Sequence, residues 1–133
     1  MLKSKMSDYL QDNVDPYYYL NHGQVLPHPI AQDICYCLDS NYWKGVTLSD
    51  FLRKHRRQLV TDKVDINGNY IPRRLTPRET WRLMGVNDED FDKASQLVSR
   101  TSLYRQSGNS IVVNVLEAIF KQLFINTHRY SLV

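Results

Sequence analysis

The chain has 133 residues, enough for one domain with a modest core but little room for an enzyme that binds a large cofactor and a polymer substrate together. Apolar residues make up 42% and charged residues 23%, which argues against disorder, collagen-like repeats and coiled coils. The net charge is only +3, but nine of the 17 lysines and arginines lie between Phe51 and Arg82, so the middle of the chain is a basic island.

The sequence predicts no membrane-spanning segment, no disulfide and no metal site. No apolar run approaches the roughly 20 residues that span a bilayer, and the first residues lack the apolar middle of a signal peptide. We therefore expect a cytoplasmic protein with no membrane partner. The two cysteines, Cys35 and Cys37, are too close along the chain for a mutual disulfide, and we interpret them as buried, reduced thiols. The four histidines are scattered and follow no zinc spacing, so no metal site is predicted.

The first third of the chain predicts little regular structure. Residues 6–15 read as a short acidic helix that must stop before Pro16, and an aromatic cluster follows it. Glycine and two prolines make residues 21–33 a loop. The apolar, β-prone residues 34–38 predict a strand.

Residues 48–59 predict an amphipathic basic helix. Thr47 or Ser49 can cap its start, and apolar residues line one side while cations project from the others. A solvated surface and a phosphate-binding surface are both compatible with this pattern. Phosphate contact gains support because closely spaced like charges repel one another unless an anion approaches. The cations are Arg53, Lys54, Arg56 and Arg57.

A hairpin and a firmly specified helix should follow. The Asn67-Gly68 pair tolerates positive φ and predicts a tight turn between strands 64–66 and 69–71. Next, Thr76 is a natural N-cap, and Glu79 completes a capping box three residues later. Pro77 suits the first helical position, and Gly85 suits the end of the helix.

The last part of the chain should contain an unusually apolar helix. Residues 90–97 predict one helical turn, and residues 110–124 predict a helix capped by Asn109 or Ser110. Its apolar residues cover almost the whole circumference, so it needs to be enclosed. Either it is the central helix of a self-sufficient core, or part of its surface meets another polypeptide or a part of the same fold that this sequence lacks. The predicted fold class is α+β, with short strands and a basic helix followed by two capped helices.

Two segments resemble the last two conserved motifs of the cytosine-5 DNA methyltransferases. The first is RRLTPRETWRLMGV, residues 73–86, and the second is SLYRQSGNSIVVNVLEAI, residues 102–119. The resemblance is firm over 73–124 and weaker before. It implies the C-terminal third of such an enzyme, divided into an N-terminal helix and linker segment 1–20, a reduced target-recognition-like region 21–72 and the closing motifs with the last helix 73–133. The residues that carry the pattern most clearly are Thr76, Pro77, Arg78, Glu79, Gly85 and Gly108.

The family's catalytic parts have no counterpart in this sequence. No proline precedes Cys35 or Cys37, and the family's F-x-G-x-G loop and Glu-Asn-Val segment are missing. Methylation of cytosine C5 needs a thiolate, an acid at N3 and bound S-adenosylmethionine. We therefore expect no catalytic residue and no activity alone, with S-adenosylmethionine bound only together with a catalytic partner. An independent enzyme that uses either cysteine, with His55 as base, is the least favoured alternative because nothing nearby lowers a thiol pKa.

The resemblance also implies roles for individual residues. Asn109 and Ser110 would face the cofactor, and double-stranded DNA would be contacted by Arg53, Lys54, Arg56, Arg57, Arg73 and Arg74. Arg78 and Arg82 would brace the scaffold through carboxylates, while the helix 110–124 would bind a catalytic chain or another protein. The chain would thus be a non-catalytic subunit or fragment of a methyltransferase. The alternative is a free-standing DNA-binding or inhibitory protein of phage or mobile-element type that reuses this half of the fold.

Overall fold

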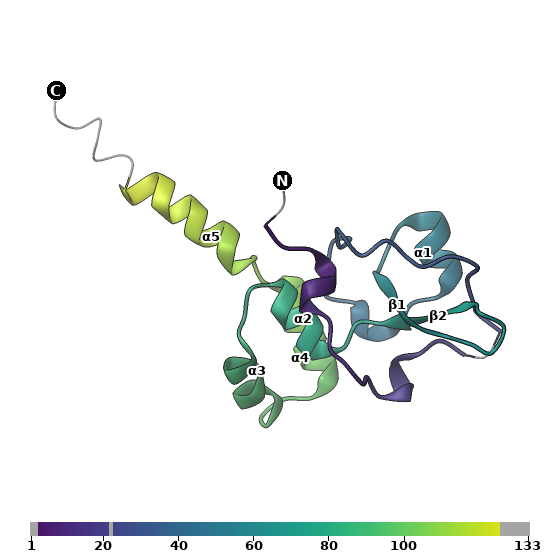
Figure 1. Cartoon of the computed structure of the whole chain (residues 1–133). Coiled ribbons are helices and arrows are strands. Elements are labelled where there is room, and N and C mark those ends of the chain that lie inside the picture. The colour runs from purple at the N-terminus through teal and green to yellow at the C-terminus, as the bar shows by residue number, and fades with distance from the viewer. Residues whose placement is uncertain (1–2, 22, 126–133) are drawn as a thin grey trace.

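The computed structural model describes residues 3–21 and 23–125. Four short helical turns and five α-helices accompany one two-stranded sheet in the described chain, so the fold is mixed α+β (Figure 1). The short turns are η1 (Met6–Tyr9), η2 (Pro16–Tyr18), η3 (Tyr42–Lys44) and η4 (Lys121–Ile125). The α-helices are α1 (Leu48–Lys54), α2 (Pro77–Leu83), α3 (Asp88–Ser95), α4 (Arg100–Asn109) and α5 (Val113–Phe120), and the strands are β1 (Leu59–Val64) and β2 (Tyr70–Arg74).

The sheet is a hairpin around the predicted Asn67-Gly68 turn, but its strands are longer and start further from the turn than the predicted strands 64–66 and 69–71. Residues 65, 66 and 69 belong to the connection and not to a strand. β1 and β2 pair antiparallel from Leu59 opposite Arg74 to Val64 opposite Tyr70. Gly68 has φ +80° in the connecting turn, a backbone conformation that glycine adopts without strain. The N-terminal segment runs along the other edge of β2 and forms isolated bridges to it. This third chain segment covers an edge that would otherwise expose unpaired backbone groups.

The basic helix is shorter than predicted. Thr47 caps α1 by accepting the amide of Asp50 at 3.0 Å, as expected, but the helix ends at Lys54 because His55 has a left-handed backbone. Leu59, which we assigned to this helix, belongs to β1 and is fully buried. The cations after position 54 therefore lie on an irregular connection.

The predicted strand over residues 34–38 is wrong. These residues have no regular secondary structure. Their segment contacts the β1 side of the hairpin through side chains instead of a backbone ladder, since the amide of Tyr36 donates to the side chain of Gln58 at 2.8 Å and the side chain of Gln32 donates to the carbonyl of Thr61 at 2.8 Å. Both cysteines are free thiols, but only Cys35 is partly covered, whereas Cys37 is exposed. Burial raises the pKa of the Cys35 thiol to about 12, which makes it a poor nucleophile at neutral pH.

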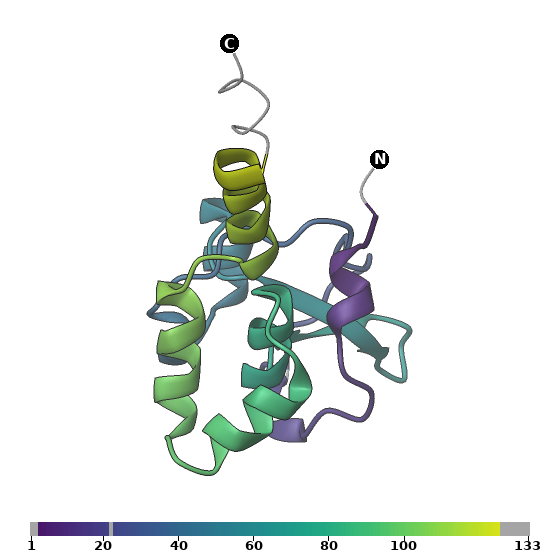
Figure 2. The same cartoon turned by 90° about the vertical axis from the view of Figure 1, so that its left-hand side faces the viewer.

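Three helices after the hairpin pack together (Figure 2). The capping box of α2 is confirmed, with Thr76 accepting the amide of Glu79 and Glu79 accepting the amide of Thr76. Gly85 ends this region with φ +84°. The helical turn predicted at 90–97 is the helix α3, but α4 was not predicted. Its buried residues are Leu103, Tyr104 and Ser107, and only the first two are apolar in an otherwise polar sequence, so no apolar period revealed the helix.

One hydrophobic core joins all parts of the chain. Its buried residues come from the N-terminal segment, from residues 42–51, from β1 and from α4. Leu75, the residue that leads into α2, is fully buried at the centre of this cluster. The core residues are Met6, Val14, Tyr18, Tyr42, Val46, Phe51, Leu59, Val60, Leu75 and Tyr104.

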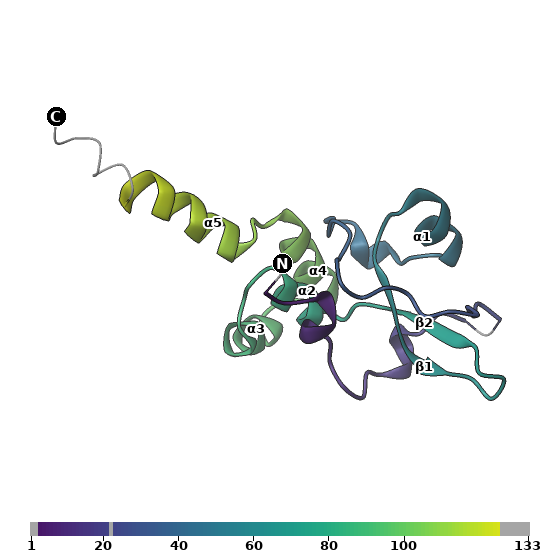
Figure 3. The ribbon, with the colours of Figure 1, turned by 45° about the horizontal axis from the view of Figure 1, so that its top comes forward.

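The final helix stands apart from this core (Figures 1 and 3). α5 starts at Val113, whose amide donates to the carbonyl of Met84 at 3.0 Å, and then projects away from the other helices. No residue of α5 or η4 is buried. The predicted cap is wrong, since Asn109 ends α4, Ser110 is its C-cap, and Val112 precedes α5 without a side-chain cap.

Candidate nucleic-acid and partner interface

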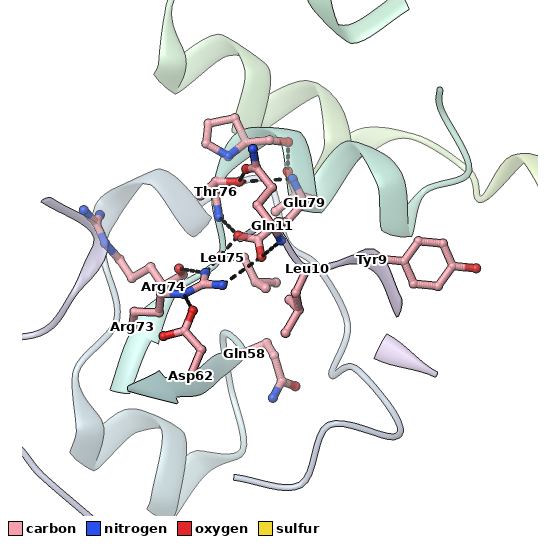
Figure 4. A network of polar contacts seen from close by, with 12 residues as sticks. Tyr9, Leu10, Gln11, Gln58, Asp62, Arg73, Arg74, Leu75, Thr76 and Glu79 are labelled. Atoms are coloured by element: carbon pink, nitrogen blue, oxygen red, sulfur yellow. Dashed lines mark hydrogen bonds and ion pairs between the residues drawn. The ribbon is translucent and has the colours of Figure 1, made fainter. Parts of the chain in front are cut away.

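A buried ion network lies where the hairpin meets α2 (Figure 4). Arg73 is fully buried and donates to both oxygens of Glu79, at 2.9 and 3.0 Å. Its Nε donates to Asp62 at 2.6 Å. Burial alone would lower the pKa of the Arg73 guanidinium, but the hydrogen bonds and charges of Glu79 and Asp62 outweigh it and raise that pKa. Arg73 is thus a permanent, compensated charge inside the protein.

This burial contradicts the expected contact between Arg73 and a DNA phosphate. Neighbouring residues of a strand point to opposite faces, so only one of Arg73 and Arg74 can reach solvent. Figure 4 shows that the side chain of Arg74 leaves in the other direction, away from the network. Arg74 is half-buried and remains a candidate for phosphate contact.

Glu79 organises more than its own helix. Besides Arg73, its carboxylate accepts the amides of Thr76 at 2.8 Å and Gln11 at 3.2 Å. The hydroxyl of Thr76 also bonds the side chain of Gln11. One fully buried carboxylate therefore connects the N-terminal segment, β2 and the start of α2. A charged group this well satisfied holds its partners in one arrangement, and its role here is structural.

The two other arginines of the first motif are paired on the surface of the helical cluster. Arg78 contacts Asp92 at 2.5 Å and Asp88 at 3.7 Å. Arg82 binds Asp88 with two hydrogen bonds, at 2.8 and 2.6 Å. Both arginines thus link α2 to α3 through carboxylates, in the bracing arrangement that the resemblance implied.

The basic residues near α1 divide into two kinds. Arg53 and Arg56 are exposed and have no carboxylate within ion-pair distance among the described residues, and Lys54 is exposed beside Asp50 at 3.0 Å. Arg57 differs, because it is half-buried, donates to the carbonyl of Gly45 at 2.9 Å and pairs with Asp39 at 3.6 Å. The structure therefore leaves three of the four predicted cations accessible to an anion and gives Arg57 a structural position.

The Gly-Asn-Ser segment lies at the end of α4, not at a helix start. Asn109 and Ser110 are exposed, and Ser110 lines a small pocket of about 120 Å³ with Trp81, Met84 and Val86. We expected free amides at a helix start to bind a polar group of the cofactor. Asn109 and Ser110 lie at a helix end, so they offer no such amides. Exposed polar side chains beside a small apolar pocket form at most one edge of a larger site.

Gly108 has a packing role that sequence reasoning missed. A Cβ atom built on it would lie 2.2 Å from the backbone carbon of Asp39 and 2.3 Å from the amide nitrogen of Ser40. α4 therefore touches the segment 39–40 backbone to backbone, and glycine is needed because any side chain would collide. In the sequence, the one hint of this contact was that the resembling motif has a glycine at this position.

The apolar character of the last helix is displayed on the surface. Phe120 is 49% exposed and Phe124 is 66% exposed, and the two rings lie 5.8 Å apart. A contiguous apolar surface of this kind marks an interaction site. Its exposed members are Ile111, Val113, Val115, Ile119, Phe120, Leu123, Phe124 and Ile125.

By length and composition alone, the helical run Arg100–Ile125 could also cross a membrane, and none of its most apolar part is buried. The run is not one continuous helix, however, because Ser110 and Val112 have extended backbone angles between α4 and α5. Residues 103, 104 and 107 of the first half are buried in the protein core or against it. These features indicate a bent connection whose second half is free to meet an apolar surface.

Comparison with known proteins agrees with the two motifs. The sequence profile described as C-5 cytosine-specific DNA methylase matches residues 2–125. The type II methyltransferase M2.ScrFI of Lactococcus lactis subsp. cremoris is 64% identical over 123 residues, which are 92% of this chain and 34% of that protein. The DNA-cytosine methyltransferase of Escherichia coli (strain K12) is 37% identical over 106 residues, 77% of this chain and 22% of the relative.

A phage relative matches a shorter part. The orphan methyltransferase M.Rho11sI of Bacillus phage rho11s is 54% identical over 55 residues, 41% of this chain and 11% of the relative. The chain thus spans about a third of the length of M2.ScrFI and less of the other two. Because the family profile covers nearly the whole sequence, the chain belongs to the C-5 cytosine-specific DNA methylase family.

Proposed function

We propose that this chain is a non-catalytic C-terminal portion of a cytosine-5 DNA methyltransferase, a subunit or a fragment, that completes a separate catalytic chain. It contributes DNA contacts and one edge of the S-adenosylmethionine pocket. The order of its two motifs supports the C-terminal position. The span of about a third of M2.ScrFI supports the need for further parts of the enzyme, which supply the thiolate and most of the cofactor pocket.

The exposed apolar helix carries this proposal. α5 and η4 have no buried residue although their sequence is apolar on nearly every side. Burying such a surface stabilises a complex by about 25 cal/mol per Å² of apolar area. The catalytic chain is the proposed cover because the helix is continuous with the second motif. A partner that belongs to the same enzyme would cover the apolar surface of α5 and η4 permanently, as in other obligate complexes.

The cofactor role belongs to Asn109 and Ser110 at the base of this helix. Both are exposed, and the pocket beside Ser110 is too small for a whole nucleoside. S-adenosylmethionine therefore needs walls from the catalytic chain and is not held by this chain alone. DNA contact is assigned to the accessible cations Arg53, Lys54, Arg56 and Arg74, acting in the cytoplasm on double-stranded DNA.

The test is reconstitution of methylation. The chain is mixed with the part of M2.ScrFI that it does not cover, and transfer of a labelled methyl group from S-adenosylmethionine to duplex DNA is measured. We expect activity only in the mixture. Phe120→Asp should abolish the complex, because it places a charge in the apolar interface, whereas Glu117→Gln on the same helix should leave it intact.

Two outcomes would remove the proposal. A monomer that binds no apolar dye and neither joins nor stimulates the catalytic part would instead indicate a free-standing binding or inhibitory protein. Partition of the chain into lipid vesicles through α5, with no effect on methylation, would assign the apolar surface to a membrane.

A further inference from the structure

Two arginines from distant parts of the sequence meet on one tyrosine. Arg74, at the end of β2, lies 5.0 Å from the centre of the Tyr17 ring, and Arg100, at the start of α4, lies 4.5 Å from it. Both also approach the neighbouring ring of Tyr18, at 5.9 and 5.4 Å. We call Tyr17, Tyr18, Arg74 and Arg100 the arginine-tyrosine cluster. The sequence showed the tyrosines as an aromatic cluster of unknown packing, and only Arg74 among these residues was named as a DNA contact.

The cluster carries uncompensated positive charge. No acidic side chain lies within ion-pair distance of Arg74 or Arg100 in the described part of the chain. Asp15, in the same turn as Tyr17, instead accepts the backbone amide of Tyr17 at 2.8 Å. Two guanidinium groups that share one tyrosine ring repel each other, and an anion that approached both would offset this repulsion.

The cluster is also accessible and rich in donors. Tyr17 is 56% exposed, Arg100 is exposed, and Tyr18 forms the buried floor. The two arginines lower the pKa of the Tyr17 hydroxyl, first through hydrogen bonds and then through charge, so this hydroxyl is a strong donor beside them. Planar guanidinium groups match the oxygens of a phosphate, and a tyrosine hydroxyl adds a third direction.

We propose that the arginine-tyrosine cluster is a phosphate-binding site that holds one backbone phosphate of the DNA. This rests on the proposed function, because DNA is taken as the nucleic-acid partner. In Figures 1 and 2, α1 and the segment of η2 lie on opposite sides of the hairpin. The cluster therefore binds a phosphate distant from the one that α1 contacts, and the two sites together fix the orientation of the chain on the duplex.

The experiment uses the salt dependence of DNA binding. Affinity of the whole chain for a labelled 20-base-pair duplex, a length of about two helical turns, is measured by fluorescence anisotropy at increasing salt. Loss of one phosphate contact should lower the slope of log affinity against log salt by about 0.9. The double variant with Arg74→Gln and Arg100→Gln should show this loss, each single variant should weaken binding, and Tyr17→Phe should weaken binding with the slope unchanged. Lys93→Gln removes the same charge from an exposed pair with Glu89 and should change neither quantity.

The results separate this site from the general DNA role. If the chain binds DNA and the cluster variants match Lys93→Gln, the phosphate site is wrong while the DNA role stands. If they weaken only association with the catalytic chain, the cluster is a protein contact and the proposal fails. If the unchanged chain binds no DNA, the DNA role fails, and titration with inorganic phosphate decides the site. Shifted NMR signals of the Arg74 and Arg100 side chains would then support it, and unmoved signals would remove it.

Discussion

Tyr42 and Tyr104 satisfy the two backbone polar groups of the same buried residue. The hydroxyl of Tyr42 accepts the amide of Leu75 at 2.8 Å, and the hydroxyl of Tyr104 donates to the carbonyl of Leu75 at 2.6 Å. Tyr42 donates its own proton to the carbonyl of Gln58. The rings lie 5.3 Å apart. Through this pair, η3, which contains Tyr42, and α4, which contains Tyr104, are both fixed to the residue that leads into α2.

Removing either hydroxyl should destabilise the protein. Tyr42→Phe leaves the amide of Leu75 and the carbonyl of Gln58 unpaired in the core, and Tyr104→Phe leaves the carbonyl of Leu75 unpaired. Each buried loss should lower the free energy of unfolding by about 1–3 kcal/mol in urea titrations. Tyr36→Phe, which removes an exposed hydroxyl near His55, is the control and should change little. Equal stability of all three variants would contradict the structural role of the pair.

The same two tyrosines predict a loss of stability in alkali. Burial is the main cause that raises the pKa of both hydroxyls above the usual value near 10. A group whose folded pKa is raised contributes stability below the unfolded pKa and loses it as pH rises. The free energy of unfolding should therefore decline above about pH 10. Tyr42→Phe should make this decline shallower, and an unchanged slope would show that Tyr42 titrates normally.

The buried pair of Arg73 and Glu79 should be strongly coupled. Breaking it with Arg73→Met leaves Glu79 charged and enclosed, and such single changes cost about 3–5 kcal/mol. Combining Arg73→Met with Glu79→Met should cost less than the sum, because no unpaired charge remains between them. Unfolding by denaturant measures all three variants. Strict additivity would mean that the two residues do not stabilise each other.

Short sequence motifs correctly predicted the structural features that depend only on neighbouring residues. The cap at Thr76, the glycine at 85 and the Asn67-Gly68 turn each rest on a few neighbouring residues, and the structure has all of them. Arg73 and Arg74 could not be told apart, because strand register decides which of them points inward. Leu59 was misassigned since its burial depends on pairing with β2, a non-local contact.

The candidate sites followed the same rule. The many apolar residues between 111 and 124 predicted a helix that needs a covering surface. Its first residue was predicted wrongly because α4 ends just before it, and the polar sequence of α4 gave no sign of a helix. The arginine-tyrosine cluster joins positions 17, 74 and 100, and nothing in their separate surroundings indicates that they meet. Contacts between segments distant in sequence therefore account for most of what was missed.

Gly108→Ala tests the close approach of α4 to the segment 39–40. The added methyl group would overlap the backbone at Asp39 and Ser40, which cannot move as a flexible side chain could. Overpacking of this kind costs about 1–3 kcal/mol, and here the segment 39–40 must shift. We expect a lower melting temperature and altered amide signals in that segment. Gln106→Ala, an exposed change on the same helix, should leave both unchanged.

Substitution of Arg57 and of Arg53 should change different properties of the protein, although the two residues lie four positions apart in one basic run. Arg57→Gln removes the bonds to Gly45 and Asp39, so thermal stability should drop while the salt slope of DNA binding stays the same. Arg53→Gln removes an exposed charge with no carboxylate partner among the described residues. Stability should stay constant, and the slope should fall by about 0.9 if its guanidinium contacts a phosphate.

Measuring both quantities on both variants separates the solvated-surface interpretation of the basic helix from the phosphate-binding one. If α1 is only a solvated surface, Arg53→Gln changes neither stability nor slope, and Arg56→Gln behaves in the same way. If α1 lies against the DNA backbone, these two variants lose slope and Arg57→Gln does not. A basic sequence motif would then contain both kinds of arginine, distinguished by whether a carboxylate or carbonyl of the same chain already occupies the guanidinium.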